Sequence, residues 1–470
     1  MFEPYIRELA QRGHKITLIS HFPVKKQSPN ITFISLEGTA EEILFNSLSL
    51  KDKDVLLSSP FSALETLNNW GQKACDTALS HPPIRRLIDS KPKFDLVIVE
   101  YFNTDCFSVF SYIFKAPLMA IFSSVLMPWH YDRFGSPDNP SYIVNHMNNY
   151  PSEMNLKQRV LNTIATFGLK IYYRVFFSWP TDKIIRKHLK EGIPPVSEIV
   201  KNTSVFLVNS HFSVFQARPL VPGIVEVGGI HTGPGAALPK HLKDYLDKGS
   251  TILGYTIDEE RRKAIANTFR KLPLNVIWKW ENDTMPDKPS NVLIQKWIPQ
   301  NDLLAHPNVK LFVTHSGLMG TEEAVYHGVP MVMIPLFGDQ PINAASCKEK
   351  GLGVVVDYLT VTEETFSNAV RTVLEDKRYK ERADYASKTF RDRPMSSMNS
   401  AIYWTEYVIR YKGAPHLRSA AVHLPWYSEY LLDVLLIFCS VIYAVFSVAK
   451  FLVKKCLKFV KGEKKKQKRQ

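Results

Sequence analysis

Short apolar runs alternate with amphipathic stretches along nearly the whole chain. Residues 3–13 have the spacing of a helix that ends at Gly13, and residues 14–20 have the pattern of a strand. Residues 94–102 (FDLVIVEYF) form an apolar run typical of a strand buried in a parallel sheet. Runs of the same kind follow at residues 116–124 and 203–210. The first half of the chain therefore predicts an α/β domain.

The second half repeats this alternation after a stretch rich in Gly and Pro. Apolar runs recur at residues 275–280, 291–297, 309–315 and 330–336. The stretch at residues 231–239 (HTGPGAALP) is typical of an interdomain linker. The pattern predicts two α/β domains, residues 1–230 and 240–394, with parallel sheets facing across a cleft.

An apolar segment near the end of the chain predicts a membrane span. Residues 395–429, which open with a helical stretch, lead to this segment at residues 430–453. A helix of this length can cross the ~30 Å hydrocarbon core of a bilayer, although a buried core helix can have the same composition. The Lys-rich residues 454–470 favour a transmembrane helix with a cytosolic tail.

The net charge of +14 is concentrated in this tail. Residues 454–470 contain nine Lys or Arg and one Glu, so they carry +8 and the rest of the chain carries +6. That remainder shows no basic patch with interleaved aromatic residues, which argues against nucleic-acid binding. With 470 residues, 45% of them hydrophobic, the chain is long enough for two or three domains with cores of their own.

The end of the chain and three sequons indicate the endoplasmic reticulum. The last five residues (KQKRQ) resemble a dilysine-type retrieval signal of membrane proteins in that compartment. A cytosolic tail places residues 1–429 in the lumen, where Asn30, Asn202 and Asn282 are acceptors for N-glycosylation. The five cysteines are widely spaced and predict neither a disulfide framework nor a metal site.

Residues 313–332 (VTHSGLMGTEEAVYHGVPMV) predict a strand, a glycine turn and a helix. In an open parallel sheet, ligands bind beyond the carboxyl ends of the strands, where His315 lies. The N–H groups and dipole of the helix favour an anion, and Gly317 and Gly320 allow a phosphate to approach the backbone. Glu323 is placed to accept hydrogen bonds from a diol such as ribose. The alternative is structural: a strand-end histidine and acids that stabilise a helix N-terminus.

Two flanking motifs favour a ligand at this turn. Trp297 and Gln300, in WIPQ, precede it, and an indole there can stack on a base while the amide forms hydrogen bonds. Asp339 and Gln340, in GDQ, follow the next strand and can hold sugar hydroxyls. Each residue taken singly also has a structural interpretation: Trp297 as a core residue and Asp339 as a turn residue. Their order on successive strand ends predicts a nucleotide-sugar site.

Residues 297–344, from WIPQ to PINA, resemble the donor-binding signature of the UDP-glycosyltransferases, with matching spacing and no gap. The resemblance continues through residues 348–357 and into the apolar segment and basic tail, as in the membrane-bound animal members. Residues 132–143 (DRFGSPDNPSYI) are most similar to insect members. The family implies the GT-B type of fold, in which two Rossmann-like domains hold a UDP-sugar (C-terminal) and a small lipophilic acceptor (N-terminal).

The resemblance also implies a role for each donor-site residue. Uracil would be contacted by Trp297 and Gln300, and the ribose by Glu323. The diphosphate would be bound by His315 and Gly317, and the sugar by Asp339 and Gln340. Ser316 and Gly320 depart slightly from the residues usual in this loop, and Thr321 would supply a nearby hydroxyl. Ser250, in a Gly-Ser pair, would face the diphosphate from the start of the domain.

No cofactor and no metal are implied, because the helix dipole and the histidine would stabilise the UDP leaving group. One D-x-D pair occurs in the chain, at Asp52 and Asp54, and it is better interpreted as part of a solvated charge run.

The family's reaction is a displacement with inversion at the anomeric carbon, in which a histidine accepts the proton and a carboxylate orients it. This histidine ends a strand that precedes the first helix in the family. The sequence is therefore expected to lack that strand, the histidine and a signal peptide. His14 matches a structural position, and His21 has no motif support. The carboxylate is either Glu100, which matches by position, or Asp105, which is slightly preferred.

The C-terminal half is also expected to lack its first strand, since a helical pattern runs directly into Gly249 and Ser250. First strands lie in mid-sheet, so their loss would leave the neighbouring strands unpaired, at ~1–3 kcal/mol per buried group. Residues 251–255 (TILGY) are β-prone and available to fill this second gap, whereas nothing is available to fill the first.

These features predict a membrane-bound UDP-glycosyltransferase whose given sequence is incomplete. It would transfer a hexosyl group, glucose before glucuronate, to a hydroxyl of a small lipophilic acceptor, as a monomer or as a homo- or hetero-oligomer. The alternative is a short form that binds UDP-sugar, or pairs with full-length relatives, without catalysis.

Overall fold

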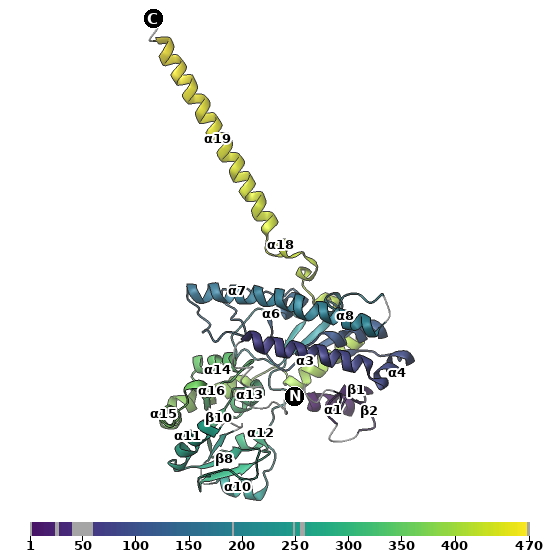
Figure 1. The fold of residues 1–470 in the computed structure, drawn as a ribbon, viewed down its shortest axis with the longest axis vertical. Helices are drawn as coiled ribbons and strands as arrows, with labels where there is room; N and C mark the ends of the chain where they lie inside the picture. The colour runs from purple at the N-terminus through teal and green to yellow at the C-terminus, as the bar shows by residue number, and fades with distance from the viewer. Residues whose placement is uncertain are drawn as a thin grey trace. The chain divides into compact units, whose positions relative to one another are not determined.

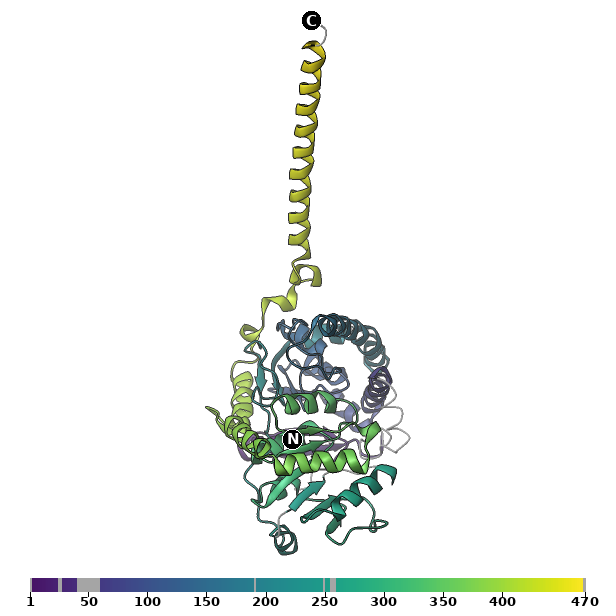
Figure 2. The same ribbon diagram turned by 90° about the vertical axis from the view of Figure 1, so that its left-hand side faces the viewer.

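The computed structural model describes residues 2–23, 28–39, 60–189, 192–247, 250–253 and 259–467. The chain divides into two compact units, Met1–Arg418 and Ser419–Gln470. Both predicted α/β halves lie in the first unit. Figure 1 labels many of its helices and some of its strands, and Figure 2 shows the same ribbon turned by 90°.

The N-terminal half contains a parallel sheet with the strand order β3-β4-β5-β6. The strands are β3 (Val97–Glu100), β4 (Leu118–Phe122), β5 (Thr203–Val208) and β6 (Ile224–Glu226). Every residue of β4 and β5 is buried, as expected for central strands of a covered parallel sheet. The helical elements of this half are α3 (Pro60–Ser80), α4 (Pro82–Ser90), η3 (Cys106–Ser108), α5 (Val109–Phe114), α6 (Pro128–Phe134), α7 (Leu156–Tyr172), the π-helix η4 (Tyr173–Ser178), α8 (Trp179–His188) and α9 (Val196–Val200).

A second, two-stranded sheet follows the first helix. Helix α1 (Phe2–Gln11) leads to β1 (Ile16–Ser20), which pairs in parallel with β2 (Ile31–Ser35). Within the described part of the chain, no strand connects β1 to β3, so the N-terminal strands form two sheets rather than one.

The C-terminal half has one six-stranded parallel sheet in the order β12-β11-β10-β7-β8-β9. The strands are β7 (Ser250–Leu253), β8 (Asn275–Lys279), β9 (Val292–Gln295), β10 (Val309–Thr314), β11 (Met331–Met333) and β12 (Gly353–Val355). Strand β7 pairs with both β8 and β10, so it occupies the central first-strand position. The expectation that this half lacks its first strand is wrong: the β-prone residues after Gly249 form it.

Helices cover both faces of this sheet. On one face, α11 (Glu259–Arg270) and α15 (Glu363–Glu375) contribute side chains to a buried hydrophobic cluster. The other face carries α10 (Lys240–Leu246), α12 (Gln300–Leu304), α13 (Leu318–His327), α14 (Gln340–Glu349) and α16 (Lys377–Arg391). Two cores on opposite faces of one sheet are the layered arrangement of doubly wound folds. The short η5 (Tyr358–Thr360) follows β12.

Helix α17 (Ser397–Arg410) packs against the N-terminal half. Its Ile402 and Val408 share a buried cluster with Tyr5 and Leu9 of α1, and the Tyr5 hydroxyl lies 2.5 Å from Thr405 Oγ1. The helical stretch expected to lead directly to the membrane therefore first completes the core of the opposite half. The remaining turns are η6 (Pro415–Leu417), η7 (Ala420–His423) and α18 (Trp426–Glu429).

A disulfide joins Cys75 in α3 to Cys106 in η3. Both cysteines are fully buried. The sequence expectation of no disulfide framework is wrong at this pair, because the chain between the two cysteines, which are 31 positions apart, folds back so that α3 lies beside η3. A buried disulfide is typical of proteins from oxidising compartments.

Helix α19 (Leu432–Gln467) belongs to the second unit. Residues Leu432–Lys458 are long and apolar enough to cross a membrane, and none of this stretch is buried. Exposure of the whole stretch contradicts the alternative of a buried core helix. The predicted span at residues 430–453 falls almost entirely within it, and the helix continues into the predicted tail as far as Gln467.

Candidate functional site

The turn between β10 and α13 lies at the carboxyl edge of the C-terminal sheet. Strand β10 is buried from Leu311 to Thr314, and α13 begins after Gly317, which is its N-cap residue. His315 is therefore placed where the strand pattern predicted, beside the free N–H groups at the start of a helix. That position combines an imidazole with the positive end of a helix dipole, which favours an anion.

The imidazole of His315 packs directly over Gly317. A Cβ atom at residue 317 would lie only 2.4 Å from His315 Nε2. The φ angle of Gly317 is −58°, which any residue can adopt, so the glycine is required by this close approach and not by its backbone conformation. The ring and the helix N-terminus thus form one continuous surface.

Ser316 has an unusual backbone conformation at this turn. Its φ angle is +66°, in the left-handed region that favours glycine. The residue is fully buried, its N–H donates to Thr314 Oγ1 (3.1 Å), and its carbonyl accepts from Asn343 Nδ2 (2.9 Å). These two hydrogen bonds hold a strained turn that directs His315 and Gly317.

Two of the three residues predicted for the nucleoside, Gln300 and Glu323, are brought together. Gln300 Nε2 donates to Glu323 Oε2 over 2.6 Å, although the residues lie on different helices. Burial raises the pKa of Glu323 above its ordinary value, with the Gln300 hydrogen bond acting in the opposite direction. Trp297 is 69% exposed, so its indole face is accessible to a base. The alternative of Trp297 as a core residue is wrong.

His231 joins this group and was missed in the sequence. Its Nε2 atom lies 3.1 Å from the Met319 carbonyl and 3.8 Å from Glu323 Oε1, while its Nδ1 atom lies 3.9 Å from Glu322 Oε2. Burial lowers the pKa of His231 to about 4, so the ring is neutral at physiological pH. The sequence did not predict this position because His231 lies in the segment interpreted as a linker. The only feature that could have indicated a site residue there was a histidine next to Gly and Pro.

Asp339 connects the two halves. Its Oδ2 atom accepts from Asn343 Nδ2 (2.9 Å) and from Ser124 Oγ (3.3 Å), and Ser124 follows strand β4 of the N-terminal half. Burial raises the pKa of Asp339. The side-chain oxygen of Gln340 accepts from the N–H groups of Leu336 and Phe337, so this part of its amide holds its own loop.

Glu100 lies at the carboxyl end of β3, next to this junction. Its Oε1 atom accepts from Ser123 Oγ over 3.4 Å. Burial raises the pKa of Glu100 to about 8, partly offset by hydrogen bonds from the Phe102 and Ser123 backbone and the Ser123 hydroxyl. Adjacent serines after β4 therefore connect Glu100 on one side to Asp339 on the other.

Asp105 is held in the N-terminal core. Its Oδ2 atom lies 2.6 Å from Arg133 Nη2, and both side chains are about 95% buried. Arg133 also donates to the Tyr173 hydroxyl (3.2 Å) and lies over the Tyr101 ring. The two alternatives for the carboxylate thus differ in their surroundings. Asp105 is in a buried ion pair with Arg133, whereas Glu100 accepts from Ser123, which is adjacent to the serine that contacts Asp339.

Two residues that were predicted to bind the UDP-sugar lie away from the turn or are already engaged within the fold. Thr321 is fully buried, and its hydroxyl donates to the Gly317 carbonyl within the helix, over 3.1 Å. Ser250 lies at the amino end of β7, in register with Val309 and Asn275, at the edge of the sheet opposite His315. The expectation that Ser250 faces the diphosphate is therefore wrong, and residues 254–258 at the carboxyl end of β7 lie outside the described residues.

The remaining candidates lie apart from this group. His14 Nε2 is 3.5 Å from Glu406 of α17, which fits the structural role expected for it. His21 Nε2 is 3.4 Å from Thr39 Oγ1, and Asp52 and Asp54 lie outside the described residues. Among the residues that the structure describes, no three His, Cys, Asp or Glu side chains gather as a set of metal ligands.

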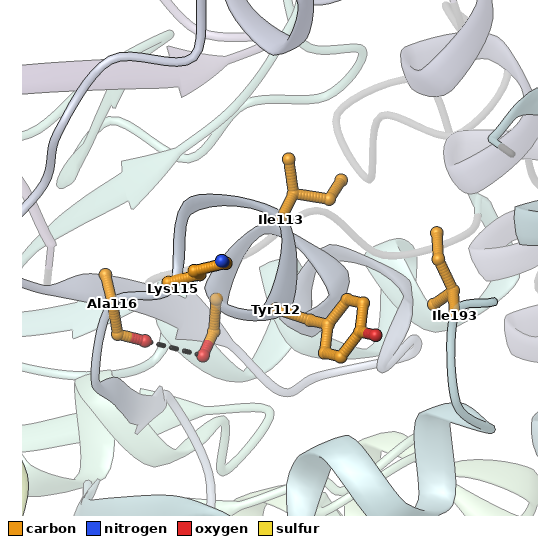
Figure 3. A pocket seen from close by; sticks show the side chains of 6 residues that line it. Tyr112, Ile113, Lys115, Ala116 and Ile193 are labelled. Carbon is orange, nitrogen blue, oxygen red and sulfur yellow. Dashed lines mark hydrogen bonds between the residues drawn. The ribbon is translucent and has the colours of Figure 1, made fainter.

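A surface hollow of about 470 Å³ lies beside α5 (Figure 3). Its lining consists of Ser111, Tyr112, Ile113, Lys115, Ala116 and Ile193. The Ser111 hydroxyl donates to the Ala116 carbonyl over 2.7 Å and closes the end of the helix. None of the predicted site residues contributes to this hollow.

Residues 3–466 match the model of a protein family described as "UDP-glucoronosyl and UDP-glucosyl transferase". The chain is 37% identical to UDP-glycosyltransferase UGT5 of Dactylopius coccus, over 97% of this chain and 89% of that protein. It is 30% identical to UDP-glucuronosyltransferase 2B10 of Homo sapiens, over 97% of this chain and 89% of that protein.

Similar solved structures include the glycosyltransferase VinC in complex with DTDP, with a TM-score of 0.60 and 15% identity. That match covers 87% of this chain and 96% of the other. The calicheamicin glycosyltransferase CalG4 matches with a TM-score of 0.55 and 18% identity, over 87% and 94%. These structures show that the fold is of the GT-B type.

Proposed function

Because the chain belongs to the UDP-glucuronosyl and UDP-glucosyl transferase family, we propose that it transfers a hexosyl group from a UDP-sugar to a hydroxyl of a small lipophilic acceptor. The observation that carries the proposal is a pair of contacts, one among the nucleoside residues and one beside the N-terminal carboxylate. Gln300 meets Glu323 at one end, and Ser124 meets Asp339 beside Glu100 at the other.

The donor would lie along the carboxyl edge of the C-terminal sheet. Trp297 would stack on uracil, and Glu323 would accept hydrogen bonds from the ribose after Gln300 releases it. His315 and the N–H groups at the start of α13 would bind the diphosphate, and Asp339 would hold the sugar. The charge that develops on UDP would be stabilised by the helix dipole and His315, so the proposal uses no metal ion.

Transfer would invert the anomeric carbon, because the acceptor oxygen attacks from the face opposite UDP. In its ionised form Glu100 would orient the acceptor hydroxyl and accept its proton, as the acceptor oxygen bonds to the anomeric carbon and UDP leaves. A carboxyl group with a pKa of about 8 can exchange a proton near neutral pH. Asp105 would have a structural role, since a carboxylate in a buried ion pair with Arg133 is not available to substrate.

The sugar is proposed to be glucose, with glucuronate as the second choice, because both kinds of transferase occur among the similar proteins. The protein is proposed to be a glycoprotein of the endoplasmic-reticulum membrane with its first unit in the lumen. The Cys75–Cys106 disulfide supports an oxidising compartment, and the apolar helix α19 supports a membrane anchor.

A second possibility is a chain that binds UDP-sugar without transferring it. The observation that favours it is the separation of β1 and β2 from the sheet that carries Glu100. A split sheet holds the acceptor side less rigidly than a continuous one, whereas the donor sheet is complete.

One experiment tests both functions. The full chain, expressed in microsomes, is incubated with UDP-glucose or UDP-glucuronate and a panel of phenols and aliphatic alcohols, and products are detected by mass spectrometry. We expect glucosides that disappear in Glu100→Gln while UDP binding is retained. UDP binding without any product would establish the second possibility, and no UDP binding would contradict both.

A further inference from the structure

The segment that joins the two halves of the first unit is held by hydrogen bonds to the donor side. It runs from the end of β6 to the start of α10. Asn301 Nδ2 donates to the Gly233 carbonyl over 3.3 Å, and the Ala236 N–H donates to Asp302 Oδ1 over 2.9 Å. Because Asn301 and Asp302 both lie on α12, the segment is fixed to the start of that helix.

Close packing at two glycines fixes the same segment. The φ angle of Gly229 is +75°, in the region that favours glycine, and a Cβ atom there would lie 2.8 Å from the Phe390 ring. A Cβ atom at Gly235 would lie 2.4 Å from the Ala305 Cβ. The segment therefore differs from a flexible linker, and His231, which lies between the two glycines, has a defined position.

The His231 imidazole reaches from this segment onto the first turns of α13. Its Nε2 atom lies 3.1 Å from the Met319 carbonyl, which can only accept, so Nε2 carries the ring proton. The same atom lies 3.8 Å from Glu323 Oε1. The Nδ1 atom keeps a lone pair and lies 3.9 Å from Glu322 Oε2. The ring thus lies between two adjacent acids, with its N–H group on the side of Glu323.

A neutral ring suits this position. Burial lowers the pKa of His231 to about 4, and its side chain is only 8% exposed. Burial also raises the pKa of Glu322 to about 8, and a protonated Glu322 does not repel the Nδ1 lone pair. A charged imidazolium would form an ion pair with Glu323 and compete with a ligand for its charge. A neutral N–H group instead orients the carboxylate and leaves its charge for the ligand.

The Glu323 carboxylate is fixed from two sides. Its Oε2 atom accepts from Gln300 Nε2 over 2.6 Å, and its Oε1 atom faces His231. Gln300 begins α12, the helix to which the segment of His231 is bound. The Glu323 side chain is 14% exposed, so one edge of its carboxylate is open to a ligand. When a ligand replaces Gln300 at Oε2, His231 remains beside Oε1.

We propose that His231 is a positioning residue that holds the Glu323 carboxylate in the orientation that recognises the ribose diol. The inference rests on the proposed function, in which Glu323 binds the ribose. His231 acts through Glu323, and it makes the segment between the two halves part of nucleotide recognition. Loss of its N–H group should therefore weaken the binding of nucleotides that carry the diol and spare those that lack it.

The test compares UDP with 2′,3′-dideoxy-UDP by isothermal titration calorimetry on the full chain in detergent. His231→Leu and His231→Asn both remove the N–H group at the Nε2 position, one with an apolar and the other with a polar side chain. His231→Gln, the conservative variant, restores an amide N–H near that position. The matched control is His327→Leu, because His327 lies at the other end of α13 and its Nε2 atom is 3.1 Å from Asn301 Oδ1.

We expect the wild type to bind UDP about tenfold or more tightly than the dideoxy nucleotide, as loss of hydrogen bonds to a charged group implies. This ratio should fall about fivefold in His231→Leu and His231→Asn, through weaker binding of UDP. It should stay within about twofold of the wild type in His231→Gln and His327→Leu. Thermal unfolding shows which variants are folded, and either of the first two suffices for the decision.

An unchanged ratio in His231→Leu or His231→Asn would overturn the inference. Equal loss of affinity for both nucleotides leaves the ratio unchanged, so a merely structural role of His231 gives this result. Failure of the proposed function is distinguishable, because the wild type itself would then bind neither nucleotide. A wild type that binds both nucleotides equally would overturn the inference and the ribose role of Glu323 together.

Discussion

At the scale of single residues, the donor site depends on an exposed indole and on a strained serine. Trp297 is accessible because it lies between β9 and α12, outside either core. Ser316 is buried with a positive φ angle, so its backbone is held by the hydrogen bonds of its neighbours. In the proposed donor site, Trp297 would contribute binding energy directly, and Ser316 would contribute by placing His315.

Trp297→Ala should weaken UDP binding about 5-fold to 160-fold, because stacking of a base on an aromatic side chain is worth ~1–3 kcal/mol. Isothermal titration calorimetry with UDP checks this. Trp297→Phe is the matched control and should retain most of the affinity. Since the side chain is exposed, both variants should unfold at the wild-type temperature, and unchanged affinity in the alanine variant would exclude stacking.

Ser316→Gly should stabilise the protein by about 0.5–1 kcal/mol. A non-glycine residue in the left-handed region costs ~1–2 kcal/mol, and the greater freedom of glycine in the unfolded chain offsets part of the gain. Thermal unfolding in detergent gives the difference. Ser316→Ala keeps the backbone strain, so a glycine variant no more stable than the alanine variant would contradict this account.

At the scale of elements, glycines and a disulfide determine how helices approach the strands that carry the site. Gly317 lets the His315 ring lie against the start of α13. The Cys75–Cys106 bond ties α3 to η3, directly after Asp105 and its ion pair with Arg133. The N-terminal carboxylates thus lie on a part of the sheet that is held by a covalent link and by a buried charge pair.

The double variant Cys75→Ser, Cys106→Ser should lower the free energy of unfolding by ~2–4 kcal/mol, the usual effect of removing a native disulfide. Chemical unfolding with and without dithiothreitol measures it. Reductant should destabilise the wild type and leave the double variant unchanged. Cys439→Ser with Cys456→Ser, which changes only exposed thiols of α19, should behave as the wild type.

At the scale of the whole first unit, the two halves meet around a buried acid. Glu322 of α13 is fully buried, and a Cβ atom at Gly228 would lie 2.7 Å from its Oε1 atom. Burial raises the pKa of Glu322 to about 8, partly offset by the Gly229 backbone and the Asn209 side chain of the N-terminal half. The junction is therefore sensitive to the protonation of one carboxyl group.

The pH dependence follows from this raised pKa. Between about pH 4.5 and pH 8 the folded state holds a proton on Glu322 that the unfolded state releases, so stability falls as pH rises through this range. Glu322→Gln cannot ionise and should be more stable than the wild type at pH 8, on the order of a few kcal/mol, and similar at pH 4.5. Unfolding temperatures across this range test it. The exposed Glu375→Gln is the control, and a constant difference between Glu322→Gln and the wild type would refute the account.

The sequence alone determined which residues make up the proposed donor site. Trp297, Gln300, His315, Glu323 and Asp339 fall within 48 consecutive residues (297–344). Consecutive strand ends of a parallel sheet share one edge, so spacing along the chain was enough to predict that these side chains lie together. The alternating apolar runs predicted the α/β class for the same reason, because a buried strand and an amphipathic helix each have a local signature.

Only the tertiary structure decided the features that depend on contacts between distant segments. Burial with Arg133 separated Asp105 from Glu100, and Ser124 brought Asp339 to the N-terminal half. The pairing of β7 with β8 and β10 places Ser250 at the amino end of its strand, opposite the edge where a ligand is expected. The packing of α3 on η3 brings together two cysteines that are 31 positions apart. Such contacts depend on how whole elements pack, and the local pattern of apolar and polar residues contains no record of which distant side chain will be the neighbour.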